Sequence, residues 1–423
     1  MRHKLSHLPN KLPFLTVPIP NTDSVTLTIW ANVGSRNETG KVAGISHFLE
    51  HMVFKGTTKR PTPKIIAEEI DSFGGEFNAG TSKEWTNFYI KAPVKRLETA
   101  FDVLSDMVLD PLIDKEALGR EKGVIVEEIG MYEDTPSAHI GDLFERLIFA
   151  KSVLGRDIIG TRETVRGVKR GDFTKYRNKH YFAKNFLVTV SGGVGQKKVN
   201  GLVQKYFSGL KSGTKRKDPK LKIVQTKPQL SVTYKKSEQA HLILGFLGTP
   251  RGHKDRFIES VLTTILGQGM SSRLFTEVRE KRGLAYAVRS SATGYQDTGY
   301  VDTYAGVDPK RATEAVKVIL DQHMGLANGE YKITDKELKK AKEYIKGHLA
   351  LGLENTKAIN SFFGVQQLKR GKIDTPDFIY KSIDKVSISQ VLQVAKKLYT
   401  KENLNLAVIG PFKNKSAFQT IIN

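Results

Sequence analysis

The sequence predicts an α+β fold of two similar domains from an internal duplication, each an antiparallel-rich sheet with helices packed on one face. The chain has 423 residues, which is more than one ordinary hydrophobic core accommodates. Three blocks of sequence recur once in the same order. Within each half, strand-like and helix-like segments are grouped rather than strictly alternating, and this grouping favours α+β over a parallel α/β sheet.

The internal repeat determines the expected domain organisation. Its paired blocks are offset by 215, 221 and 218 residues: 88–108 with 303–324, 114–135 with 335–356, and 184–193 with 402–411. Three blocks at nearly one offset indicate duplication of a folding unit. We therefore expect a first domain at 1–212, a basic inter-domain linker at 213–230 and a second domain of similar fold at 231–423.

Both halves carry the same order of elements. We expect an early strand, a helix, a strand hairpin, two or three further helices and a closing strand in each. The paired segments are strands 25–34 and 240–248, helices 43–54 and 257–266, and hairpins 74–92 and 285–307.

Composition narrows the possible functions. The chain contains no cysteine, so disulfides and thiolate metal sites are excluded and any metal must be bound by His, Asp or Glu. A formal net charge of +23 is compatible with nucleic-acid or other acidic partners. The charge is spread along the chain, however, and its densest run, 211–222, lies between apolar segments as a solvated linker would. Because no zinc finger, RNP motif or basic dimerising helix accompanies it, we expect no nucleic-acid partner.

No targeting or membrane signal is apparent. The first twenty residues lack the uninterrupted apolar stretch of a secretory signal, and no run approaches the length of a membrane span. We therefore expect a cytoplasmic protein that does not associate with membranes.

The segment "GISHFLEHMVFKGT" at 44–57 suggests metal chemistry. On a helix, His47 and His51 stand about 40° apart around the axis, so both imidazoles can reach one cation. Glu50 lies on the flank of that face, where it can contact a metal-bound water without being a ligand. The alternative is an apolar helix with two hydrogen-bonded core histidines. A catalytic zinc would also need a third protein ligand.

The segment "REKGVIVEEIGMYED" at 120–134 offers that ligand. Glu121 and Glu128 are seven residues apart, about 20° around a helix, whereas Glu127 is turned away. Two carboxylates on one partly buried face are costly unless a cation meets them. Glu128 would be the third ligand, and Glu121 an outer partner that orients a histidine or completes the charge balance. The alternative is a solvated acidic helix.

The second half of the repeat favours the metal interpretation. Glu121 aligns with Lys342 and Glu128 with Leu349. Alignment of "GISHFLEH" with "GMSSRLFT" at 269–276 puts Ser272, Phe275 and Thr276 at the positions of His47, Glu50 and His51. Residues needed only for packing would tend to persist in both copies, but all the proposed site residues are missing from one half together.

These segments together resemble the inverzincin metallopeptidases of the pitrilysin type, peptidase family M16, and most closely the bacterial members that are similar to the processing-peptidase β subunit. Other matching segments are "GGEFNAGTSKEWTNFYI" at 74–90, "QAHLILGF" at 239–246 and "VREKRGLAYAV" at 278–288. One departure is "LPNKLP" at 8–13, where Lys11 stands at a position at which the family usually has Gly.

The resemblance implies a site and a reaction. It implies one Zn²⁺ per chain, bound by His47, His51 and Glu128, with Glu50 as the general base and Glu121 as the outer-shell acid. It implies that Asn78 contacts the backbone of a bound peptide. Arg279 and Tyr286 would bind substrate from the second domain, and Tyr286 would also assist catalysis. Because one chain carries both the zinc-site residues and the Arg–Tyr pair, the resemblance implies a homodimer.

We therefore expect a zinc-dependent endopeptidase that hydrolyses short, unfolded or extended peptides, with Glu50 acting on zinc-bound water. Two alternatives remain. One is a non-catalytic assembly subunit of the same fold, like the core proteins of the bc1 complex. The other is a nucleic-acid-binding protein, for which the net charge is the sole indication.

Overall fold

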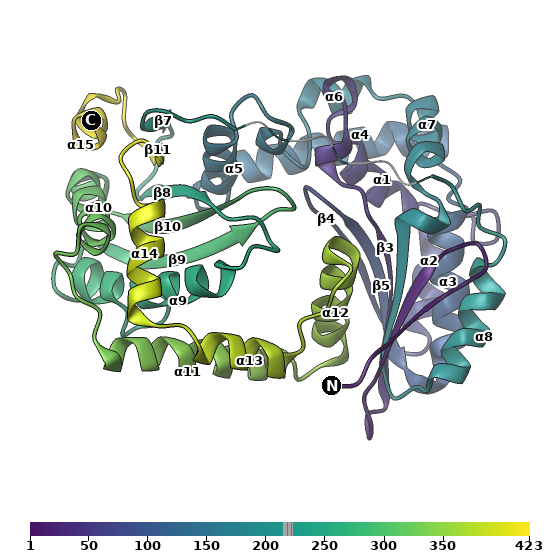
Figure 1. Ribbon diagram of the computed structural model, residues 1–423. Helices are drawn as coiled ribbons and strands as arrows, with labels where there is room; N and C mark the ends of the chain where they lie inside the picture. Colours follow the sequence, from purple (N-terminus) through teal and green to yellow (C-terminus); the bar gives the residue numbers. More distant parts are fainter. Residues whose placement is uncertain (215–217, 219–220, 222) are drawn as a thin grey trace. The chain divides into compact units, whose positions relative to one another are not determined.

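A computed structural model describes residues 1–423 except 215–217, 219–220 and 222. The described residues form two compact units (Figure 1). Unit 1 comprises those of Met1–Ile129, Arg156–Pro219 and Leu351–Thr375, and unit 2 those of Gly130–Gly155, Lys220–Ala350 and Pro376–Asn423. The predicted domains, 1–212 and 231–423, are each one continuous stretch of chain. Each observed unit also includes a segment from the other half of the chain. The predicted linker 213–230 lies partly outside the described residues.

Unit 1 is built on a six-stranded sheet of order β1-β2-β6-β3-β5-β4. Its strands are β1 Lys4–His7, β2 Pro13–Pro18, β3 Ser24–Ala31, β4 Glu76–Thr81, β5 Thr86–Pro93 and β6 Phe186–Gly192. The β2–β6 pair is parallel and all other pairs are antiparallel. In the turn between β1 and β2, Lys11 adopts a left-handed φ of 70°, a conformation that glycine adopts without strain.

Helices share the apolar core on one face of this sheet. They are α1 Ile45–Val53, α2 Pro63–Asp71, α3 Leu97–Leu109, α4 Lys115–Glu133, α6 Arg162–Gly167, α7 Arg170–His180 and α8 Gln196–Phe207, of which α4 continues into unit 2. Val25, Leu27 and Ile29 of β3 alternate with polar neighbours and join these helices in one apolar core.

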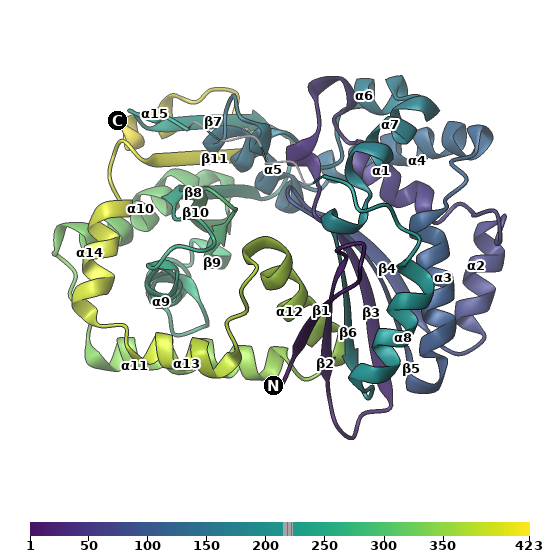
Figure 2. The same cartoon turned by 45° about the vertical axis from the view of Figure 1, so that its right-hand side comes forward.

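The opposite face of the sheet is covered by α12 Thr356–Arg370, which comes from the C-terminal half of the chain (Figures 1 and 2). The contact is polar but buried. Nδ2 of Asn360 donates to the backbone oxygens of Thr26 (2.9 Å) and Thr189 (3.1 Å), and the Thr189 hydroxyl donates to Oδ1 of Asn360. The helix approaches closely, because a Cβ at Gly364 would lie 2.7 Å from the Trp30 ring.

Unit 2 repeats this plan with five strands of order β7-β11-β8-β10-β9. The strands are β7 Gln229–Tyr234, β8 Ala240–Gly248, β9 Ala285–Gly294, β10 Gly299–Val307 and β11 Leu404–Gly410. As in unit 1, one pair (β7–β11) is parallel and the rest are antiparallel. This order equals β2-β6-β3-β5-β4 of unit 1, so the topology agrees with the duplication.

Unit 2 has its own core of helices and one exchanged helix. The core helices are α9 Arg256–Gly267, the π-helix η6 Phe275–Glu280, α10 Ala312–Asn328, α11 Asp335–Gly352, α13 Pro376–Asp384, α14 Ile388–Leu398 and α15 Ser416–Ile422, of which α11 continues into unit 1. The other face of the sheet is covered by α5 Pro136–Ile148, which comes from the N-terminal half of the chain. The α+β class and the two similar sheets are confirmed; the helix on the second face of each sheet was not predicted.

The order of elements corrects one alignment. The counterpart of α1, the first helix after the long strand β3, is α9 after β8. Residues 269–276 follow α9 and lead into η6, at the place that α2 occupies in unit 1. The alignment of 44–51 with 269–276 was therefore wrong. The two histidine ligands are still missing from the second half, because α9 contains no histidine.

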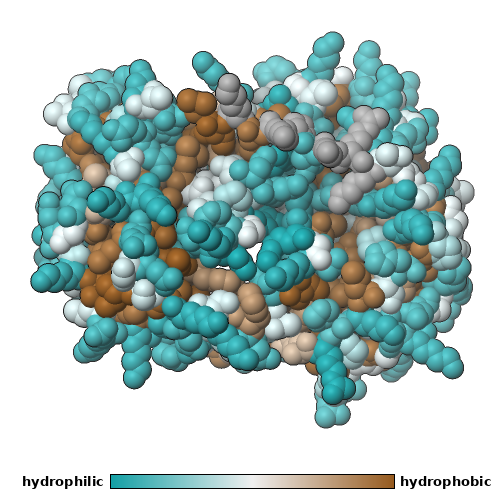
Figure 3. All heavy atoms as spheres, viewed as in Figure 1, coloured by the Kyte–Doolittle hydropathy of each residue, from teal (hydrophilic) through white to brown (hydrophobic). Residues whose placement is uncertain are grey.

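Hydrophilic residues cover most of the molecular face shown in Figure 3, and smaller apolar areas lie between them. None of the helices in the described part of the chain combines the length and the hydropathy that a membrane span needs.

Candidate metal centre and active site

Helix α1 places two histidines and a glutamate beside each other. Its apolar residues face the core of unit 1: Ile45, Phe48, Leu49, Met52 and Val53. His47, Glu50 and His51 lie on the remaining face and are partly buried. Within nine residues, the helical repeat therefore places the apolar side chains on one face and the metal-site side chains on the other.

Helix α4 contributes two carboxylates two turns apart. Ile125 and Ile129 anchor the helix in the core of unit 1. Glu121 is 5% exposed, and Glu128 is partly exposed. Both carboxylates reach the histidines of α1, as the seven-residue spacing predicted.

His47, His51 and Glu128 form a cluster whose size fits one ion. The Nε2 atoms of the two histidines are 3.3 Å apart. The Glu128 carboxylate lies 3.7 Å from Nε2 of His47 and 3.5 Å from Nε2 of His51. Tetrahedral zinc at about 2.0–2.1 Å from its ligands separates these ligands by about 3.3 Å. Among the described residues, this is the one group of three such side chains that could hold a metal ion.

The protonation states suit a cation. Burial, together with the neighbouring His51, lowers the pKa of His47 to about 3, so its ring is neutral near pH 7 and can donate a lone pair. Burial, together with Glu121, raises the pKa of Glu128. Buried Nδ1 of His47 has no hydrogen-bond partner among the described residues. A cation would offset the cost of the buried carboxylates.

Glu121 orients His51 from behind. Its Oε1 lies 2.8 Å from Nδ1 of His51, and its Oε2 lies 2.7 Å from Nζ of Lys55. Burial disfavours the charge of Glu121, but the hydrogen bonds from His51 and Lys55 outweigh burial and lower its pKa. A carboxylate on Nδ1 directs the Nε2 lone pair toward the cluster, as in many histidine–metal sites.

Glu50 is held by the neighbouring strand. The Thr81 hydroxyl on β4 donates to Oε2 of Glu50 at 2.5 Å. Burial raises the pKa of Glu50 and Glu128 adds to this, while the Thr81 hydrogen bond and His51 oppose it. Glu50 is thus electrostatically coupled to two members of the cluster.

Strand β4 is the edge strand of the sheet, and it carries Asn78. This residue is exposed and pairs in register with Tyr89 of β5, and its Oδ1 accepts the amide hydrogen of Ala79 at 2.8 Å. The outer edge of β4 has no strand partner among the described residues. An extended chain could pair with such an edge.

Arg279 and Tyr286 come together in unit 2. The guanidinium carbon of Arg279 lies 4.8 Å from the centre of the Phe275 ring and 5.2 Å from that of Tyr286. Tyr286 is 77% exposed. Arg279 lies on η6, and π-helical turns often occur at functional sites. Because this pair and the metal cluster belong to different units, a shared role remains a prediction.

Sequence reasoning missed Lys55 and Thr81. Lys55 stands four residues after His51, so the i, i+4 spacing could have indicated it. Thr81 lies in "FNAGTS", but no sequence signal connects it to Glu50.

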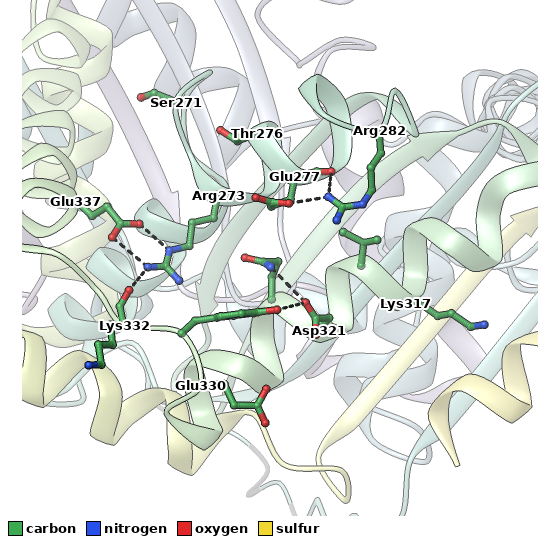
Figure 4. A pocket seen from close by; sticks show the side chains of 13 residues that line it. Ser271, Arg273, Thr276, Glu277, Arg282, Lys317, Asp321, Glu330, Lys332 and Glu337 are labelled. Atoms are coloured by element: carbon green, nitrogen blue, oxygen red, sulfur yellow. Dashed lines mark hydrogen bonds and ion pairs between the residues drawn. The ribbon is translucent and has the colours of Figure 1, made fainter.

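A cavity of about 910 Å³ lies in unit 2, lined by residues of 271–282, α10 and 330–337 (Figure 4). Most of its charged side chains have a partner within the lining. Arg273 binds Glu337 at 2.7 Å, and Arg282 binds Glu277 at 2.6 Å. The Tyr331 hydroxyl donates to Asp321 at 2.6 Å. Because most of these charges are already paired, we assign no ligand to the cavity.

Two family models match the chain. Residues 14–162 match "Insulinase (Peptidase family M16)" and residues 167–345 match "Peptidase M16 inactive domain". An uncharacterized zinc protease of Streptomyces coelicolor is 38% identical over 97% of this chain and 90% of its own length. The uncharacterized zinc protease YmxG of Bacillus subtilis is 37% identical over 93% of this chain and 95% of its own.

Solved structures share the fold. A protease from Helicobacter pylori superposes with a TM-score of 0.91 at 25% identity, covering 97% of this chain and 99% of that one. A chain of complex III2 from Candida albicans has a TM-score of 0.86 at 16% identity and covers 99% of both chains. At that identity the likeness shows the fold alone.

Proposed function

The chain belongs to peptidase family M16, and on this premise we propose that it is a zinc-dependent endopeptidase acting on short, unfolded or extended peptides. The observation that carries the proposal is the cluster of His47, His51 and Glu128, with Glu121 behind His51. The names of the relatives support zinc as the metal.

The chain's own residues supply the steps of hydrolysis. A zinc ion bound at the cluster would polarise the scissile carbonyl and lower the pKa of a water molecule. Glu50 accepts a proton from the attacking water and later delivers it to the leaving amine as the C–N bond breaks. The Thr81 hydroxyl, 2.5 Å from Glu50, keeps that carboxylate in one orientation. The hydroxyl of Tyr286, assisted by the charge of Arg279, stabilises the tetrahedral oxyanion.

The exposed edge strand β4 supports the proposed substrate class. A peptide that pairs with β4 must be extended, because its backbone has to offer a ladder of hydrogen bonds. Asn78 would contact this backbone. Folded proteins hold their backbone groups in their own secondary structure, so short or unfolded peptides are favoured.

We also propose that the enzyme is a cytoplasmic homodimer with one zinc per chain. Light scattering would test the dimer, and metal analysis would test the zinc content.

The alternative is a non-catalytic assembly subunit of the same fold, which a chain of complex III2 shares. The intact set of cluster residues and Glu50 argues for the enzyme, because an assembly role requires neither a metal nor a base.

The test combines metal content with cleavage. The purified chain should bind about one zinc per chain and cleave a quenched peptide. A chelator should abolish cleavage, and added zinc should restore it. Glu50→Gln should retain zinc and lose cleavage by a factor of 10² or more, on the order expected for a general base. Full activity in Glu50→Gln would refute the assigned base. Zinc binding without cleavage by the wild type would favour the assembly subunit.

A further inference from the structure

A buried carboxylate lies at the start of the metal-binding helix α1. Glu38 is 6% exposed and belongs to the loop before the helix. Its Oε2 accepts the amide hydrogen of Gly44 at 2.7 Å, and its Oε1 accepts that of Ser46 at 2.8 Å. Ser46 directly precedes His47.

Helix α1 requires this external acceptor. The first amides of a helix have no partner within it, and a side chain of the N-cap residue usually accepts one of them. The N-cap here is Gly44, which has no such side chain. A larger residue is excluded, because φ is +93° and a Cβ would lie 2.5 Å from the backbone oxygen of Ile159. Glu38 therefore takes the capping role from six residues upstream.

The surroundings hold this cap in place. Nη1 of Arg156 donates to the backbone oxygen of Glu38 at 2.8 Å. The Ser46 hydroxyl lies 2.6 Å from that of buried Tyr176. Thr164 donates to the backbone oxygen of Ala43 at 2.7 Å. Glu38, Ala43 and Ser46 are thus all anchored by residues of the 156–176 region.

This arrangement is expensive for the fold. Burial raises the pKa of Glu38 to about 7, although hydrogen bonds from Ser46 and Gly44 and the charge of Arg156 oppose the shift. The helix dipole favours a negative charge at this position, but burial of the Glu38 carboxylate outweighs that benefit. A buried carboxylate at such a cost indicates a requirement other than stability.

We propose that Glu38 is a positioning residue for the metal centre: by holding the amides of Gly44 and Ser46 it sets the start of α1, and with it the rings of His47 and His51. The effect passes through the backbone of α1, since Glu38 itself is no ligand. The inference rests on the metal site of the proposed function, but not on the cleavage reaction.

The test compares two buried carboxylates. Glu259 of α9 in unit 2 is 4% exposed, and its carboxylate accepts the amide (3.1 Å) and hydroxyl (2.9 Å) hydrogens of Thr249. Glu259→Gln is therefore a matched control for Glu38→Gln. In Glu38→Gln the amide group must turn its NH₂ toward one backbone N–H, so one of the two hydrogen bonds is replaced by a donor–donor contact.

Zinc affinity of the metal-free full chain is measured by competition with a chromophoric chelator, and circular dichroism verifies folding. We expect Glu38→Gln to weaken zinc binding about tenfold, the lower end of the effect of residues that orient ligands, and Glu259→Gln to leave it unchanged. For peptide cleavage at saturating zinc, kcat should fall while KM changes little. Glu38→Asp, which keeps the charge but is one methylene shorter, should give an intermediate affinity and serves if Glu38→Gln does not fold.

Wild-type zinc affinity in both folded Glu38 variants would overturn the inference, as would an equal loss in Glu259→Gln. A wild type that binds zinc but cleaves nothing would refute the proposed peptidase while the affinity comparison still decides the role of Glu38. A wild type that binds no zinc would overturn both.

Discussion

The Nδ1 atom of His51 lies 2.8 Å from Oε1 of Glu121, a carboxylate that comes from a helix seventy residues further along the chain. This contact determines which nitrogen of His51 faces the cluster. With Nδ1 donating to Glu121, Nε2 carries the lone pair, 3.3 Å from Nε2 of His47 and 3.5 Å from Glu128. Lys55, which binds the second oxygen of Glu121, keeps the carboxylate charged without a metal.

Glu121→Gln should weaken zinc binding by about 10- to 100-fold, because the neutral amide makes His51 a poorer ligand. Competition with a chelator measures this affinity. Glu127→Gln, on the exposed side of the same helix, is the matched control and should bind zinc as the wild type does. Equal affinities for the two variants would contradict the role of Glu121.

Thr81→Val should lower kcat about tenfold and leave zinc content unchanged, because Glu50 loses the hydroxyl that orients it. Steady-state cleavage of a quenched peptide measures the effect. Thr81→Ser retains the hydroxyl and should restore most of the rate. A serine variant as slow as the valine variant would show that packing, rather than the hydrogen bond, matters at this position.

Tyr286→Phe should reduce kcat by about 10² without changing zinc affinity, as expected when one donor to the oxyanion is lost. Tyr234, another exposed tyrosine of unit 2, provides the control Tyr234→Phe, which should cleave at the wild-type rate. If Tyr286→Phe changes KM alone, the tyrosine binds substrate but does not stabilise the oxyanion.

Stability should depend on pH through Glu38. Between pH 4.5 and about 7, Glu38 is ionised in the unfolded chain but still protonated in the fold, so the folded state binds more protons. Its contribution to the free energy of unfolding therefore falls as pH rises through this window. At about 1.4 kcal/mol per pH unit, the loss is roughly 3 kcal/mol by pH 8.

Glu38→Gln cannot titrate, so the wild type should lose roughly 3 kcal/mol relative to this variant between pH 5 and pH 8. Urea unfolding at a series of pH values measures the difference. Glu127→Gln, which removes an exposed carboxylate, should follow the wild type. Parallel curves for Glu38→Gln and the wild type would show that the pKa of Glu38 is not raised.

Asn360→Ala should destabilise unit 1 by about 2–3 kcal/mol, because it removes two donations to strand carbonyls and the acceptor of the Thr189 hydroxyl. The urea midpoint measures the loss. Gln367→Ala, a partly exposed position on the same helix, should cost less than 1 kcal/mol. A small effect at Asn360 would mean that packing alone holds α12 on the sheet.

Much of the fold follows from local patterns. The α1 and α4 segments each keep their metal-site residues on one helix face, because 3.6 residues per turn bring positions i, i+4 and i+7 together. Strand alternation places Val25, Leu27 and Ile29 on the core face. The duplication can be recognised in the sequence because both halves keep the same order of strands. Each sheet needs that order to form its core.

The sequence by itself determined the α+β class, the duplication and the residues from which a metal site can be built, because each depends on spacing along the chain. The tertiary structure alone decided that α12 and α5 each cover a sheet formed by the other half of the chain. At α12 the contact is made by buried Thr and Asn side chains, which in the sequence read as surface residues. It also decided that Thr81 holds Glu50 and that Glu38 caps α1. Such contacts join residues far apart in the chain, so only the packing of the core brings them within hydrogen-bonding distance.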